Sequence, residues 1–244
     1  MIFLDKIIDW FISNLAVAIL SFFVGTALSW IISNKNIFKI GFDSIIHWNQ
    51  EYRMSISYLF KIKIDNKYLL IKGNRIEQYQ PIGGVYKYYE SFKDNFNKWG
   101  VRDENEESFY EENDLRIYVK GKYLCKVIKW FETMQNREFS VDREFKEELI
   151  HTDILPYDAL YNAEFEFLSR QNSGVHVSQH FKCREVLIYD IIEVKLRKED
   201  VDILVDKCKT DIQIIFADYE SIERECVSIM GKSCKIGAHA KYIK

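Results

Sequence analysis

The chain has 244 residues, of which 48% are hydrophobic and 15% aromatic, enough to bury a sizeable core in one or two domains and too many for a disordered protein. Its formal net charge of −3 gives no large electrostatic attraction to nucleic acid, so duplex nucleic acid is not an expected partner. The five cysteines are widely spaced and form no CxxC pair, which leaves the zinc and disulfide interpretations weak and predicts reduced, buried thiols in a cytosolic domain.

The first 35 residues are predicted to form a transmembrane helix. Residues 15 to 32 (LAVAILSFFVGTALSWII) contain no charge, which is near the lower length limit for a membrane span. Trp10 and Trp30 would lie roughly 30 Å apart on a helix, at the two interfaces of a bilayer. Lys35 and Lys39 follow the span, so the positive-inside rule predicts a single-pass protein whose residues 36–244 are cytoplasmic.

Two alternatives to the membrane span fit the sequence less well. A cleaved signal peptide needs a basic start and a small-residue cleavage site, whereas Asp5 and Asp9 stand in the start and SWIISNK follows the apolar run. A buried core helix is seldom apolar all round. Within the span, small residues recur every fourth position at Ser21, Gly25 and Ser29. This spacing favours close helix packing and self-association in lipid, although small residues are also common in membrane helices generally.

Beyond residue 40, hydrophobic alternation and turn residues predict a mixture of hairpins and helices. The first half is expected to contain a hairpin (54–65 and 66–73), a turn and strand (81–90), an acidic loop (102–114) and either a strand pair or a strand running into a helix (115–131). The second half is expected to contain a helix with Ser140 as N-cap (140–150), a hairpin around an Asn-Ser-Gly turn (163–171 and 174–181), a strand (184–196), a helix (198–209), a strand (211–217) and a helix (218–230). The pattern predicts α+β or α/β/α layers rather than a doubly wound parallel sheet.

The heptapeptide REFKEEL (143–149) places Glu144, Glu147 and Glu148 at positions i, i+3 and i+4, which share one face of a helix. Three like charges on one face cost stability unless water or a cation screens them. Mg²⁺ and Mn²⁺ accept carboxylate oxygens and bridge to substrate phosphates, so the face could bind a divalent metal ion. A solvated surface helix is the plainer alternative.

Residues 143–148 resemble the second half of the Nudix box, which reads Arg-Glu-apolar-any-Glu-Glu. The first half of the box is a glycine followed by five residues and a glutamate, which Gly84 and Glu90 match. Pro81 and Gly83 resemble the Pro-Gly-Gly sequence that precedes it, and the predicted hairpin stands where the family has its first two strands. The resemblance implies a mixed-sheet α/β/α sandwich.

Two departures separate the chain from the Nudix pattern. The 52 residues from 91 to 142 stand where the family has seven, so the box is split by an insertion. Ile150 also replaces the glycine that the family places two residues after the last glutamate. The predicted fold class is therefore α/β, with an N-terminal transmembrane helix (1–35) and a cytoplasmic Nudix-like domain (36–244) that carries an insertion at about 91–142.

A membrane helix, a Nudix-like domain with a QPIGGVYK strand and a closing GAHAKYIK together resemble the SMODS-associated Nudix domains, effectors of bacterial CBASS antiphage systems. The resemblance implies that a CD-NTase makes a cyclic di- or trinucleotide, which the effector binds. It further implies an effector in the bacterial inner membrane that forms homo-oligomers and damages the bilayer. The alternative function is a membrane-tethered, Mg²⁺-dependent hydrolase of nucleoside diphosphate derivatives.

The resemblance also assigns roles to individual residues. Glu144, Glu147 and Glu148 would bind Mg²⁺ or Mn²⁺, with Glu147 or Glu148 near the attacking water and Arg143 orienting the carboxylates. The catalytic residues would thus be Arg143, Glu147 and Glu148. Gly83, Gly84 and Glu90 would form the ligand-binding part, since glycine allows close approach of the backbone.

A cyclic nucleotide needs cations for its phosphates and flat rings for its bases. Candidates near the predicted site are Lys61, Lys63, Arg75, Tyr79 and Tyr86, although alternating Lys and Tyr is also ordinary on exposed strands. His176 and His180 could pair on zinc if helical, but the alternation around them predicts a strand.

Overall fold

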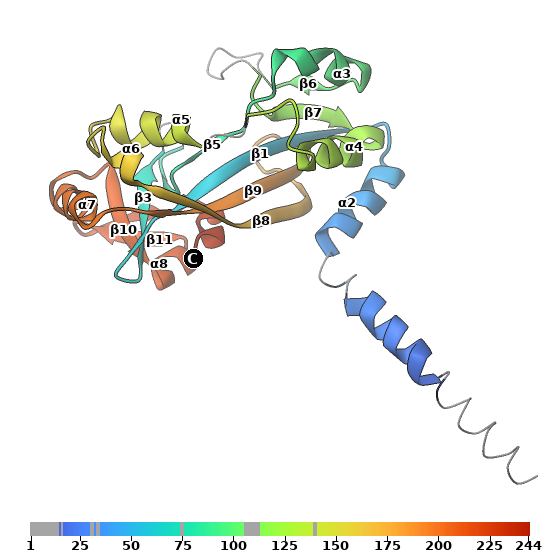
Figure 1. The fold of residues 1–244 in the computed structure, drawn as a ribbon, viewed down its shortest axis with the longest axis horizontal. Helices are drawn as coiled ribbons and strands as arrows, with labels where there is room; N and C mark the ends of the chain where they lie inside the picture. The colour runs from blue at the N-terminus through green and yellow to red at the C-terminus, as the bar shows by residue number, and fades with distance from the viewer. Residues whose placement is uncertain are drawn as a thin grey trace, which may run out of the picture.

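The computed structural model describes residues 15, 17–29, 32, 35–73, 76–104, 113–138 and 141–244 (Figure 1). The predictions that concern Asp5, Asp9, Trp10, Trp30, Arg75 and Ser140 lie outside these residues. Residues 17–29 are helical and their side chains are exposed. In the described part of the chain, no helix is both long enough and apolar enough to cross a membrane.

The main sheet is mixed and is built around the long strand β1 (Glu51–Lys61), which is buried along almost its whole length. It pairs in parallel with β9 (Arg184–Lys195) over ten residues and antiparallel with the other neighbours. In spatial order the strands are β6 (Arg102–Asp103), β7 (Arg116–Lys120), β1, β9 and β8 (Glu164–Val177), with β5 (Gly83–Val85) beside the second half of β1. The predicted mixed α/β fold is confirmed.

A second sheet begins at the end of β1. Its order is β10 (Ile214–Asp218), β3 (Lys67–Lys72) and β2 (Lys63–Ile64), with β4 (Tyr79–Gln80) also on β3. Asp65 and Asn66 join β2 to β3 with φ angles of 47° and 61°. Two successive positive φ values are those of a type I′ hairpin turn, which Asp and Asn tolerate. The turn of the predicted first hairpin is confirmed. The segment predicted as its first strand is divided between β1 of the main sheet and β2 of the second sheet.

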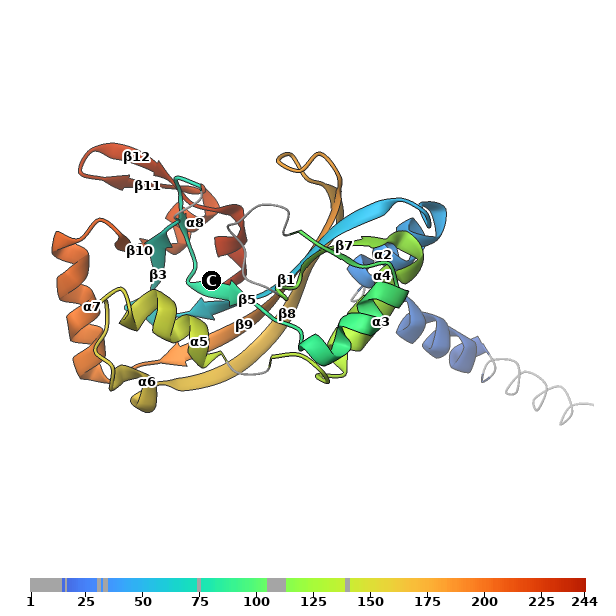
Figure 2. The ribbon, with the colours of Figure 1, turned by 90° about the horizontal axis from the view of Figure 1, so that it is seen from above.

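The two faces of the main sheet pack against different layers. The even-numbered side chains of β1 from Tyr52 to Phe60, and Ile62 just after the strand, enter the larger core. The elements α4 (Gly121–Glu132), α5 (Asp142–Phe145) and η2 (Lys146–Ile150) cover this core. Leu59 on the opposite face joins a smaller core with the second sheet, α8 (Tyr219–Glu223) and η3 (Ala238–Tyr242). The helix α5 contacts β5, and the two lie next to each other in Figure 2.

The insertion that splits the box is itself folded. Its described part contains η1 (Glu90–Phe92), α3 (Lys93–Lys98), β6, β7 and α4, so it extends the main sheet and covers one of its faces. Phe92 stacks on Trp130 with ring centroids 4.6 Å apart, and the ring of Phe96 contacts both of these rings in a T-shaped geometry. Backbone hydrogen bonds from Tyr89 to Asn136 (3.0 Å) and from Glu138 to Lys87 (2.7 Å) close its two ends.

The remaining elements include corrections to the sequence predictions. The segment 115–131 is a strand followed by a helix, β7 and α4. The Asn-Ser-Gly stretch is not a hairpin turn, because β8 runs through it with a register shift between Asn172 and Val175.

Two predicted helices are shorter than expected. The predicted helix at 140–150 is α5 followed by a π-helical turn. The predicted helix at 218–230 is α8 followed by the hairpin of β11 (Cys226–Ile229) and β12 (Lys232–Lys235). The short α6 (Ala159–Asn162) precedes β8. The strands β9 and β10 and the helix α7 (Lys198–Thr210) match their predictions.

Candidate functional site

The two halves of the split box meet at Gly84 and Glu144, which are 60 positions apart. A Cβ atom on Gly84 would lie 2.0 Å from the Cδ and 2.2 Å from the Oε1 of Glu144, so only glycine leaves room for this carboxylate. Gly83 is equally constrained, because its Cβ would lie 2.1 Å from the carbonyl oxygen of Tyr58 on β1. The structure thus brings the predicted glycines and the first predicted glutamate into direct contact.

Arg143 organises the carboxylates around this contact. Its Nη1 donates to Glu144 Oε1 at 2.8 Å and to Glu147 Oε2 at 3.2 Å, and its Nη2 donates to the Val85 carbonyl at 3.3 Å. Although burial opposes its charge, the pKa of Arg143 is raised by its hydrogen bonds with Glu138 and its ion pairs with neighbouring carboxylates. Arg143 therefore orients the carboxylates through charge-assisted bonds, as the resemblance implied.

Glu138 is a member of this cluster that the sequence analysis missed. Its Oε1 accepts from Arg143 Nε at 3.2 Å, and its side chain is only 17% exposed. It reaches Arg143 because the returning end of the insertion pairs with residue 87. No motif marks Glu138. The predicted ligand residue Glu90 instead lies at the start of the insertion, where its carboxylate bonds to Asn113 (3.1 Å) and Lys93 (3.0 Å).

Glu147 and Glu148 form a pair of like charges. Burial raises the pKa of Glu148, and the neighbouring charge of Glu147 raises it further. In the described residues, no group of three or more His, Cys, Asp or Glu side chains is arranged to hold a metal ion. The pair fits the chemistry of Mg²⁺, which proteins often bind through one or two carboxylates together with substrate phosphates. An ion bound there would offset the repulsion and polarise a phosphate.

Tyr58 lies between this cluster and the middle of the sheet. It is fully buried, and among the described residues its hydroxyl has no hydrogen-bond partner. Burial raises its pKa, and the charges of Glu144 and Glu138 raise it further. Its ring meets Tyr86 edge-on, with centroids 4.9 Å apart. The carboxylate cluster therefore adjoins a buried aromatic wall.

The other predicted ligand residues separate in space. Tyr86 lies on the face of the sheet that carries Glu144, where its hydroxyl donates to Asp190 at 2.9 Å. Lys61 and Lys63 instead flank the ring of Tyr68, and Tyr79 belongs to the smaller core. Of the two histidines, His176 is on β8 and bonds to Glu185 at 3.0 Å, whereas His180 lies beyond the end of that strand, so the histidines do not share a strand face.

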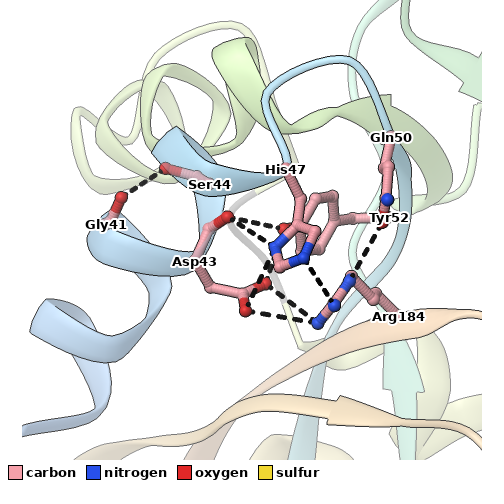
Figure 3. A network of polar contacts seen from close by, with 7 residues as sticks. All are labelled: Gly41, Asp43, Ser44, His47, Gln50, Tyr52 and Arg184. Atoms are coloured by element: carbon pink, nitrogen blue, oxygen red, sulfur yellow. Dashed lines mark hydrogen bonds and ion pairs between the residues drawn. The ribbon is translucent and has the colours of Figure 1, made fainter.

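A polar joint fixes the helix α2 (Lys35–Ile46) to the edge of the Nudix-like domain (Figure 3). Arg184 of β9 donates to both carboxylate oxygens of Asp43, at 3.2 and 3.3 Å, and to His47 Nε2 at 2.9 Å. The Tyr52 hydroxyl of β1 donates to Asp43 at 2.6 Å. A Cβ on Gly121 would lie 2.6 Å from the His47 carbonyl oxygen, so α4 also approaches this joint closely. The helix is thus tied to the two central strands.

Comparison with known protein families places the chain in one of them. The family model described as SMODS-associated NUDIX domain matches residues 51–244, which is more than half of the chain and includes both halves of the box. No curated protein matches the chain in sequence.

Proposed function

Because the chain belongs to the SMODS-associated Nudix domain family, we propose that it is a CBASS effector whose Nudix-like domain senses a cyclic di- or trinucleotide. The observation that carries the proposal is the reassembled box, in which Gly84, Glu144 and Arg143 converge although an insertion separates them in sequence. Glycine at position 84 lets the carboxylate of Glu144 stay beside Arg143, and a carboxylate cluster of this kind fits phosphate chemistry. Under this proposal a CD-NTase supplies the signal.

The output of the effector would be membrane damage. Residues 15–32 carry no charge, and we propose that they form a single span in the bacterial inner membrane with the Nudix-like domain in the cytoplasm. Ser21, Gly25 and Ser29 would pack copies of the span together in a homo-oligomer. The joint of Asp43 with Arg184 supports transmission, because a helix bonded to both central strands follows any change in the sheet.

The proposal is tested with the full chain in liposomes loaded with a fluorescent dye. A panel of cyclic di- and trinucleotides is added, bound ligand is identified by mass spectrometry, and dye release is recorded. We expect one cyclic nucleotide to be retained intact and to trigger release. Gly25→Leu should abolish release without changing ligand affinity, because no atom of another described segment lies within 4 Å of a Cβ there.

The matched control for Gly25→Leu is Ala27→Leu, which puts the same side chain on nearly the opposite face of the same helix. It should leave release unchanged. Equal loss in both variants would refute helix packing through the small residues. Absence of any bound cyclic nucleotide would refute the sensing function.

The second candidate function is Mg²⁺-dependent hydrolysis of nucleoside diphosphate derivatives, and the like-charge pair Glu147 and Glu148 favours it. Under this function Glu147→Gln removes turnover of a dinucleotide pyrophosphate, while unfolding temperature stays within a few degrees of the parent chain. Glu199→Gln, at an 83% exposed carboxylate on α7, is the matched control and should retain turnover. Turnover that persists in Glu147→Gln would count against this site as the centre of hydrolysis.

A further inference from the structure

A cavity of about 210 Å³ opens on the face of the main sheet that carries Glu144. Its floor includes Tyr86, Asp190 and Arg170, and its walls come from both Phe167 on β8 and the returning end of the insertion, Arg137. Sheet register places the cavity in line with the box, because Tyr58 pairs with Gly84 on one side and Asp190 on the other, and Asp190 pairs with Arg170. Paired residues in a sheet point to the same face.

The cavity carries an excess of positive charge. Two of its lining side chains are guanidiniums and one is a carboxylate. Asp190, which is 2% exposed, is bonded twice to Arg170, at 2.6 and 2.9 Å, and also accepts from the Tyr86 hydroxyl. The negative charge of Asp190 therefore balances that of Arg170, and the lining keeps a net positive charge from the other arginine.

Arg137 is that second arginine, and it is only 3% exposed. Its guanidinium stacks over Phe131 at 4.0 Å and Tyr86 at 4.9 Å, and donates to two backbone carbonyls, of Phe131 and Glu138. Among the described residues, no carboxylate forms an ion pair with it. Burial lowers the pKa of Arg137 and the neighbouring charge of Arg170 lowers it further, and Tyr86 and Asp190 offset this only in part. A buried guanidinium that has only neutral hydrogen-bond partners and shares the nearby carboxylate of Asp190 with Arg170 would be stabilised further by an anionic ligand.

We propose that this cavity binds a nucleotide, with its phosphate on Arg137 and its base against Phe167. Guanidinium forks match phosphate oxygens, and aromatic faces stack on any base. Phe167 is 58% exposed at the mouth of the cavity, which is unusual for phenylalanine and leaves its ring open to a base. A cavity of this size is smaller than the clefts that enclose whole drug-sized ligands, so it takes one nucleotide unit of a larger ligand.

The inference deepens the proposed function and rests on it for the identity of the larger ligand. It assigns the insertion a role, since Arg137 lies at its returning end. The box would then hold the next phosphate of the same ligand, because the transverse row from Gly84 through Tyr58 to Asp190 joins the two places.

The test uses the full chain in detergent and titration calorimetry with four probes: adenosine, adenosine 5′-monophosphate, inorganic phosphate and a cyclic dinucleotide. We expect the monophosphate to bind, phosphate to compete with it, and adenosine to bind at least about tenfold more weakly. Arg137→Gln should weaken the monophosphate at least about tenfold, and Phe167→Ala about fivefold or more. The control Arg102→Gln removes a half-exposed arginine that pairs with Glu51 and should change nothing.

Arg137 is buried, so Arg137→Gln is accompanied by Arg137→Lys, which keeps the charge, and by thermal unfolding of each variant. Phe167→Ala changes an exposed ring and reports on the cavity even if both arginine variants unfold. Binding of the cyclic dinucleotide that is unchanged in Phe167→Ala and in a folded Arg137→Gln would overturn the cavity while leaving the sensing function standing. Monophosphate binding that depends on both residues, without binding of the cyclic dinucleotide, would support the cavity and count against a cyclic dinucleotide as the signal. Absence of binding by every phosphate-bearing probe would overturn the cavity as well.

Discussion

Replacing Gly84 by alanine should damage the site in a way that can be traced to a single side chain. The added Cβ would overlap the carboxyl group of Glu144, with contacts of 2.0 to 2.2 Å, so Glu144 must swing away from Arg143. Overpacking costs about 1–3 kcal/mol, and a lost charge-assisted hydrogen bond costs about 1.5–3 kcal/mol. Because the obstructing group is a side chain that can move, we expect a net loss of about 2–3 kcal/mol.

Thermal and urea unfolding measure this loss, and a double-mutant cycle identifies its cause. A loss of 2–3 kcal/mol lowers the unfolding temperature by roughly 4–12 °C in a domain of this size. In a Glu144→Ala background the obstruction is gone, so Gly84→Ala should then cost almost nothing, and the two changes should couple by about 2 kcal/mol. Gly83→Ala is the matched control, since its Cβ would strike the backbone of Tyr58 and its cost should be the same in both backgrounds. Equal costs for Gly84→Ala in the two backgrounds would refute the reasoning.

Three further perturbations test other parts of the structure. Glu148→Gln should raise the free energy of unfolding at pH 8, measured by urea unfolding, by up to about 1 kcal/mol. The raised pKa of Glu148 means that its ionised form, buried beside Glu147, destabilises the folded chain. The gain should therefore shrink as the pH falls through that pKa and the carboxylate of the parent chain becomes protonated. Burial lowers the pKa of His239 from its ordinary value of 6.5 to about 4. The free energy of unfolding should therefore fall by about 3 kcal/mol as the pH drops from 6.5 to 4 in the parent chain, because the unfolded chain binds a proton that the folded chain does not, and this loss should be absent in His239→Gln. Asp43→Asn should cost about 1 kcal/mol and speed amide exchange in α2 but not in β9, since Arg184 loses a half-buried carboxylate; equal exchange in α2 would show that the joint does not hold the helix.

Local chemistry predicted the parts of the fold that depend on neighbouring residues. Asp65 and Asn66 mark a turn because their own side chains tolerate positive φ, and the turn is present. The stretch at 172–174 has the same chemistry, including a glycine with φ of 67°, yet it is a bulge inside β8. The difference is the long pairing of β8 with β9, which is non-local and outweighs a local preference for turning.

The candidate site was predictable where the box keeps its spacing and not where the insertion supplies residues. Arg143, Glu144 and Gly84 could be paired from the motif alone. Glu138 and Arg137 could not, because their place depends on the insertion returning beside residues 87–89. The helix after Phe145 also departs from prediction: His151 N bonds to Lys146 O, five residues back, at 2.7 Å. This wider π-helical turn changes the angle between successive carboxylates, so the regular i, i+3, i+4 face does not continue past residue 145.

A box divided by 52 residues can still assemble because the insertion ends close to where it begins. The entropic cost of closing a loop grows only slowly with its length, and the two ends are held by the backbone bonds between residues 87–89 and 136–138. The insertion offsets its own ordering cost through the packing of Phe92, Phe96 and Trp130. The segment 136–138 is therefore added beside the box, and Glu144 still lies against Gly84. Arg137, which this segment brings, therefore lies on the same face of the sheet as the carboxylates, where the proposed ligand would contact both.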